Sequence, residues 1–169
     1  MKLKNPALSL ATVAMLMTGS SITYADDIVE TVHMVITGGP NAGTFDASSD
    51  KGGCSAGLTG PGSWGNQLSS PKDKDPAKFN SLQLIVPDAK KAAAGSKEFY
   101  LKVGFGPLMA RSAEYAVETR AAEPKKTGSG IVTIEDKGAT AKVTFAMTTA
   151  AGVKLEGTID CKQVARGGA

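Results

Sequence analysis

Two cysteines are the residues of this sequence whose types and spacing point most directly to a chemical role. Cys54 and Cys161 are the only cysteines among the 169 residues, and they lie far apart in the chain. An even number of cysteines favours a disulfide in an exported protein. The sequence contains no Cys-x-x-Cys redox motif and no cluster of cysteine and histidine suited to zinc. We therefore predict a disulfide between Cys54 and Cys161, with two free buried thiols as the alternative.

The segment 51–67, KGGCSAGLTGPGSWGNQ, joins one of these cysteines to six glycines and the only tryptophan. An indole beside amide side chains suits contacts with a sugar or a peptide, because an apolar plate and hydrogen-bond donors act together. Trp64, Asn66 and Gln67 are therefore candidate ligand-binding residues. The interpretation that we favour for this segment is a turn tied to the scaffold by the disulfide, with Trp64 packed over the bridge.

The single histidine, His33, limits the metal and acid–base chemistry that this chain can perform. A catalytic zinc site of the usual kind needs several imidazoles and is excluded. His33 could join a Ser-His-Asp arrangement, but the nucleophile elbow that presents such a serine belongs on an α/β sheet, which this sequence does not indicate. We expect His33 on the polar face of a strand, and we predict no catalytic residue, no metal site and no cofactor.

Carboxylates are plentiful, so a pair that hydrolyses a glycan stays open as an alternative, although no two of them stand out. Asp73 and Asp75 in KDKDP resemble calcium ligands, but the flanking lysines argue against a cation site. The segment 38–44, GGPNAGT, lacks the lysine of a phosphate-binding loop, and we predict a turn there.

Alternating apolar and polar residues indicate that short β-strands position these side chains, since successive side chains of a strand point to opposite faces. The pattern is present in three segments of the first two thirds, 28–37, 81–86 and 98–105. Between the last two, PDAKKAAAG (87–95) predicts a helix of at most two turns with Asp88 as its cap.

The last third predicts a three-stranded antiparallel meander, because three alternating segments follow one another through short glycine-containing connections. Cys161 falls on the inward row of the final strand, so its disulfide would run through the core. The 20 glycines separate short apolar stretches along the whole chain. We predict an all-β fold, an antiparallel β-sandwich of about eight or nine short strands, with a closed β-barrel as the alternative.

The N-terminus has the pattern of a secretory signal peptide. Lys2 and Lys4 precede the apolar run ALSLATVAMLM, and Thr23-Tyr24-Ala25 ends the segment with small residues where a signal peptidase cleaves. The run is shorter than the roughly 20 residues that span a bilayer. We predict a signal peptide over 1–25, a β-sandwich domain over 26–169 and export to the periplasm or the medium.

Charge argues against two classes of partner. Removal of Lys2 and Lys4 with the signal peptide takes two from the 19 basic residues, while the 16 acidic residues remain. The remaining net charge is too small to attract nucleic acid or an anionic membrane strongly. We expect no nucleic-acid partner and no membrane span. The function predicted is an exported non-enzymatic binding or interaction module for a protein, a glycan or a small-molecule ligand. The alternatives are a β-barrel carrier of a small apolar ligand and a carboxylate-based glycan hydrolase.

Overall fold

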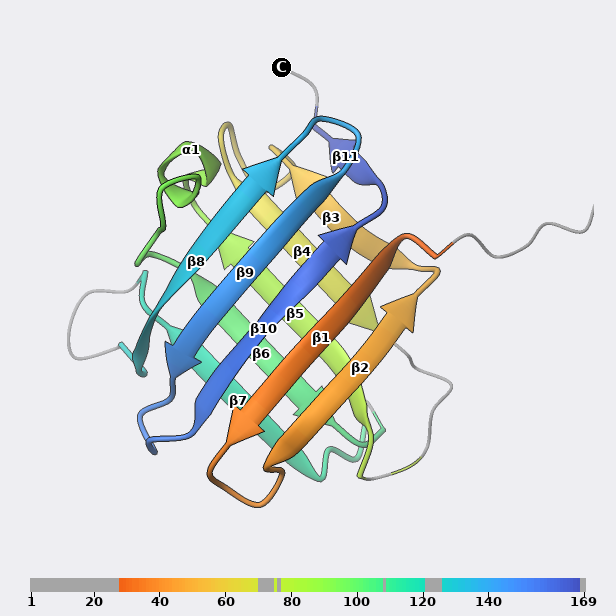
Figure 1. Ribbon diagram of the computed structural model, residues 1–169, viewed down its shortest axis with the longest axis vertical. Coiled ribbons are helices and arrows are strands. Elements are labelled where there is room, and N and C mark those ends of the chain that lie inside the picture. The colour runs from red at the N-terminus through yellow and green to blue at the C-terminus, as the bar shows by residue number, and fades with distance from the viewer. Residues whose placement is uncertain (1–27, 70–74, 76, 108, 121–125, 168–169) are drawn as a thin grey trace, which may run out of the picture.

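The computed structural model describes residues 28–69, 75, 77–107, 109–120 and 126–167, and it is a sandwich of two β-sheets. Eleven strands and one short helix make up the described part. Figure 1 shows the five-stranded sheet in front of the six-stranded sheet, with the strands of the two sheets running in different directions. The two sheets are not closed into a barrel. The predicted all-β sandwich is confirmed, and the predicted signal peptide, 1–25, lies outside the described residues.

The five-stranded sheet is antiparallel throughout. Its order is β2 (Gly43–Ser49), β1 (Glu30–Thr37), β10 (Lys154–Cys161), β9 (Ala141–Thr148) and β8 (Ser129–Asp136). The three strands β8, β9 and β10 are hydrogen-bonded in sequence order, which confirms the predicted meander. The strand β1 then adds to β10, so both halves of the sequence contribute to this sheet.

The six-stranded sheet contains the middle of the chain and its C-terminal strand. Its order is β11 (Val164–Arg166), β3 (Gly52–Ala56), β4 (Trp64–Ser69), β5 (Phe79–Val86), β6 (Tyr100–Phe105) and β7 (Ala113–Glu118). Only the pairing of β11 with β3 is parallel. The structure has more strands than the sequence predicts, because β3 (GGCSA) and β11 (VAR) are short and lack an alternating apolar pattern.

The space between the sheets is filled by apolar side chains. The largest fully buried ones are Trp64, Phe99, Phe105, Phe145, Met34, Ile36, Leu68, Leu82, Leu84, Leu101, Leu155 and Ile159. Toward one end of the sandwich, Phe105 makes edge-on contacts with the rings of Phe45 and Tyr115, at centroid distances of 5.0 and 6.1 Å. Dense packing of this kind makes the sandwich a rigid support for side chains on its outer faces.

The predicted short helix is present as α1 (Ala89–Ala92), in the connection between β5 and β6. The carboxylate of Asp88 accepts hydrogen bonds from the backbone amides of Lys90 and Lys91, at 3.0 and 3.1 Å, and caps the helix as expected. One turn of helix is too short to be stable alone, so its position depends on packing. Its buried Ala92 supplies that contact with the core.

The disulfide joins the two sheets. Cys54 lies on β3 and Cys161 at the end of β10, with their Cα atoms 5.8 Å apart. The predicted pairing is therefore confirmed. The predicted position of Cys54 in a turn is wrong, because residues 52–56 and 64–69 form two paired strands and only 57–63 form the turn between them.

Candidate functional site

The outer surface of the six-stranded sheet carries a central row of uncharged amides. Gln67 of β4 lies directly opposite Gln83 of β5, and Gln83 lies opposite Lys102 of β6. We call the surface around Gln67 and Gln83 the amide face. Both glutamine side chains are exposed, so their donors and acceptors are available to a ligand.

Two hollows meet on the amide face, and both are lined by Gln67 and Gln83. The first, of about 290 Å³, lies toward β3 and is bounded on its apolar side by Leu58 and Ile85. The second, of about 300 Å³, lies toward β7 and is bounded by Lys102, Arg111 and Glu114. Because both hollows include the two glutamines, they lie next to each other on this face, and we call the two hollows together the groove.

Small residues make the floor of the groove low. In the first hollow Gly65 leaves room for the hydroxyl of Ser55, whose oxygen lies 2.9 Å from the position that a Cβ at Gly65 would take. Ser81 and Arg111 of the second hollow both lie close to Gly104, where a Cβ would overlap the guanidinium of Arg111. Glycine permits such close approach of neighbouring groups to the backbone. Longer side chains then form the walls.

The positive charge of Lys102, which lines the second hollow, is neutralised by an ion pair with a neighbouring carboxylate. Lys102 Nζ lies 2.8 Å from Glu114 Oε2 on the neighbouring strand. This hydrogen bond to Glu114 raises the pKa of Lys102, so the ammonium stays charged. The pair is a cross-strand contact of the kind that stabilises sheets modestly.

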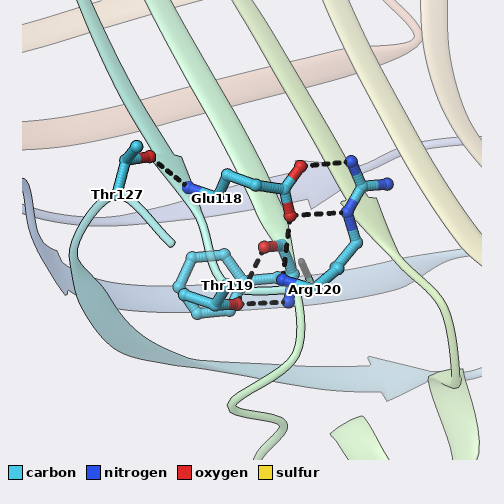
Figure 2. A network of polar contacts seen from close by, with 5 residues as sticks. Glu118, Thr119, Arg120 and Thr127 are labelled. Atoms are coloured by element: carbon cyan, nitrogen blue, oxygen red, sulfur yellow. Dashed lines mark hydrogen bonds and ion pairs between the residues drawn. The ribbon is translucent and has the colours of Figure 1, made fainter. Parts of the chain in front are cut away.

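The border of the amide face at the end of β7 is closed by a polar network, shown in Figure 2. Arg120 donates to both carboxylate oxygens of Glu118, at 2.9 and 2.6 Å. Its guanidinium also lies 5.2 Å from the centre of the Tyr100 ring. The backbone amide of Glu118 donates to Thr127 Oγ1 at 3.0 Å, and the hydroxyl of Thr119 donates to the carbonyl of Phe99 at 2.8 Å. The charges of Arg120 and Glu118 therefore compensate each other, and the guanidinium of Arg120 lies over the ring of Tyr100.

The three residues predicted to bind a ligand do not lie together. Trp64 is fully buried and Asn66 is 3% exposed, whereas Gln67 is exposed on the amide face. All three belong to β4, where adjacent side chains point to opposite faces. A ligand on the outer surface can therefore reach Gln67 and not the indole of Trp64. Its partner Gln83 was missed, although its polar position between Leu82 and Leu84 indicated an outward side chain.

Asn66 instead meets a buried carboxyl between the sheets. Its Nδ2 donates to Glu30 Oε2 and lies 3.4 Å from the sulfur of Cys54. Among the described residues, Glu30 Oε1 and Asn66 Oδ1 are buried with no hydrogen-bond partner. Burial raises the pKa of Glu30 from 4.5 to about 7, and the hydrogen bond from Asn66 opposes only part of that rise. A protonated carboxyl has an O–H donor, which the unpartnered Asn66 oxygen can accept.

Glu30 was not among the predicted site residues, although the period of the first strand places it on the inward row two residues before Val32. The two inward neighbours on that row, Val32 and Met34, are buried, and Glu30 is buried with them. Ile28, which the pattern also assigns to that row, precedes β1 and is half exposed. The feature of the sequence that could have identified Glu30 is therefore a charged residue in a row of inward-facing apolar residues.

His33 lies on the outer face of the other sheet, as expected. Its Nδ1 is 2.7 Å from Asp46 Oδ1 on the adjacent strand, beside a groove of about 580 Å³ that Thr31, Ser48 and Asp160 also line. The side chains of His33 and Asp46 are 53% and 76% exposed, so water screens this pair. Within the described part of the chain, no three histidine, cysteine or carboxylate side chains gather as a metal site requires.

No protein-family model matches this sequence, and neither the curated proteins nor the solved structures include one with significant similarity to it. None of the described helices is long and apolar enough to cross a membrane. A functional proposal for this chain therefore rests on the fold and on its side chains.

Proposed function

We propose that this chain is a non-enzymatic binding module whose amide face binds a glycan. The observation that carries the proposal is the pairing of Gln67 with Gln83 where two hollows meet on the sheet. Each amide offers both donors and acceptors, and sugar hydroxyls also act in both ways. Leu58 and Ile85 beside the amides provide apolar contact for the C–H face of a sugar ring.

The two alternative functions find less support. A carrier of an apolar ligand requires an internal cavity, and the sandwich interior is filled by side chains instead. A carboxylate hydrolase requires two facing acids, one with a raised pKa. Glu30 has a raised pKa, but it lies in the core against Asn66, where a glycan cannot reach it.

Replacement of both glutamines by alanine tests the glycan proposal. We expect Q67A/Q83A to weaken binding of a glycan by at least about tenfold, because several hydrogen bonds of roughly 1 kcal/mol each are lost. A panel of oligosaccharides is screened first with the unmodified protein, and the dissociation constant of the best one is then measured by calorimetry. The circular dichroism spectrum should not change, since both side chains are exposed.

The third glutamine of the chain provides the matched control. Gln163 is exposed outside the amide face, so Q163A should bind the same oligosaccharide as the unmodified protein does. Equal binding by Q67A/Q83A and Q163A would place the glycan elsewhere. A panel without any bound oligosaccharide would contradict the glycan proposal itself.

We also propose that the protein is exported and that its mature chain begins at Asp26. The disulfide between Cys54 and Cys161 supports an oxidising compartment. Expression of residues 1–169 in a bacterium with a periplasm should release a chain whose intact mass starts at Asp26 and lacks the two thiol hydrogens. A cytoplasmic product that retains residues 1–25 would contradict export, and a mass with both hydrogens would contradict oxidation in the cell.

A further inference from the structure

The three arginines of the chain differ in what holds their guanidinium groups. Arg120 pairs with Glu118, and Arg166 pairs with Asp136 through two contacts of 3.1 and 2.5 Å. Arg111 is held by neutral acceptors: its Nη1 donates to Asn80 Oδ1 at 2.5 Å and to the carbonyl of Gly106 at 3.5 Å. Among the described residues, no carboxylate pairs with Arg111.

Arg111 is oriented by a buried residue. Asn80 is 3% exposed, and its Nδ2 donates to the carbonyl of Gly106 while its Oδ1 accepts from Arg111. The guanidinium also lies against Gly104, where any larger residue would displace it. Both hydrogen bonds come from Nη1, so within the described part of the chain Nε and Nη2 face no acceptor. The orientation of the Arg111 guanidinium is thus set before a ligand binds, which reduces the conformational entropy that the side chain loses on binding.

The charges around Arg111 leave this end of the groove positive. Arg111, Lys102 and Glu114 line the second hollow together, and Lys102 and Glu114 compensate each other. The positive charge of Arg111 opposes part of the rise in the pKa of Lys102, so the two cations repel each other across the hollow. An arginine fork matches the two oxygens of a carboxylate, and such charge-assisted pairs are stronger than neutral hydrogen bonds.

We propose that Arg111 forms a subsite for the carboxylate of an acidic glycan at the β7 end of the amide face. This inference rests on the proposed glycan function and narrows its ligand to a chain that contains uronic acid. In that arrangement Gln67 and Gln83 contact the hydroxyls of one sugar unit, and Arg111 contacts the carboxylate of a neighbouring unit. Glu114 remains paired with Lys102 and limits the subsite to one anionic group.

The test compares two oligosaccharides of equal length and linkage, an oligogalacturonate and the corresponding neutral galactan. We expect the unmodified protein to bind the oligogalacturonate at least about tenfold more tightly, which corresponds to one strong charge-assisted contact. R111Q should lose this preference and bind the two oligosaccharides about equally. R120Q is the control, because Arg120 is already paired with Glu118, and it should retain the preference.

The outcomes separate this inference from the proposed function. Equal binding of both oligosaccharides, with no effect of R111Q, would overturn the carboxylate subsite and leave the glycan function standing. Binding of neither, while the panel contains another oligosaccharide that binds, would overturn the acidic-glycan assignment alone, and a panel without any bound oligosaccharide would contradict the function itself. Tighter binding of a sulfated galactan than of the oligogalacturonate would overturn the assignment to a carboxylate, and binding of a glutamate-rich peptide alone would indicate a protein partner. If R111Q does not fold, R111K keeps the charge without the fork and should lose most of the preference.

Discussion

Reduction of the disulfide between Cys54 and Cys161 is expected to lower the free energy of unfolding by as much as about 4 to 5 kcal/mol, the chain-entropy value for a loop of this length. The bridge closes a separation of 107 residues and joins β3 of one sheet to β10 of the other. Without it the unfolded chain gains conformational freedom, and the sandwich loses its covalent link between the two sheets. Urea unfolding of the oxidised and reduced protein measures the difference directly.

A double replacement by alanine, C54A/C161A, controls for effects of the reductant. It should be at least as unstable as the reduced protein, because truncation of two buried side chains also leaves a cavity. In both cases the urea concentration at the midpoint of unfolding should fall. The slope of the free energy of unfolding against urea concentration should change only modestly. A loss below about 1 kcal/mol in the reduced protein would contradict the stabilising role that we assign to the bridge.

The free energy of unfolding of the unmodified protein is expected to fall as the pH rises, and E30Q is expected to remove most of this fall. The pKa of Glu30 is raised from 4.5 to about 7 by burial, so the folded protein holds this proton more tightly than the unfolded chain does. Stability is then greatest below pH 4.5 with respect to this group, falls as the pH rises through about 7, and levels off above that. The full difference corresponds to about 3 kcal/mol.

Glutamine is neutral at every pH and can donate to the Asn66 oxygen that lacks a partner. At about pH 8, E30Q should therefore be more stable than the unmodified protein, and at about pH 4 the two should be similar. E156Q, at an exposed position of β10, is the control and should follow the unmodified protein. An E30Q variant that is less stable at both values would contradict a protonated Glu30. Chemical unfolding at the two pH values provides the measurement.

Much of the scaffold could be predicted because it depends on local pattern. The alternation in 141–148 and 154–161 specified which side chains face inward, and short glycine-containing connections specified hairpins. The capping carboxylate of Asp88 acts within one turn of chain and was also predictable. The strands β3 and β11 were not, because GGCSA and VAR show no period and pair only where neighbouring strands hold them.

The candidate site was predictable only in part. Gln67 was named, but it was grouped with Trp64 and Asn66 because the three are close in sequence, whereas the strand directs them to opposite sides of the sheet. Nothing local to Gln67 indicates that Gln83 is its neighbour. That contact depends on the register of β4 against β5, which the whole sheet determines.

By itself, the sequence determined the class of the fold, the pairing of its two cysteines and the inward or outward direction of most strand residues, since each follows from composition or from a period of two. The tertiary structure alone decided which distant residues meet. It placed Glu30 against Asn66 across the two sheets and Arg111 against the neutral side chain of Asn80 at the end of a groove. These contacts join segments tens of residues apart, so they depend on sheet order, register and the packing of one sheet on the other, which no local pattern encodes.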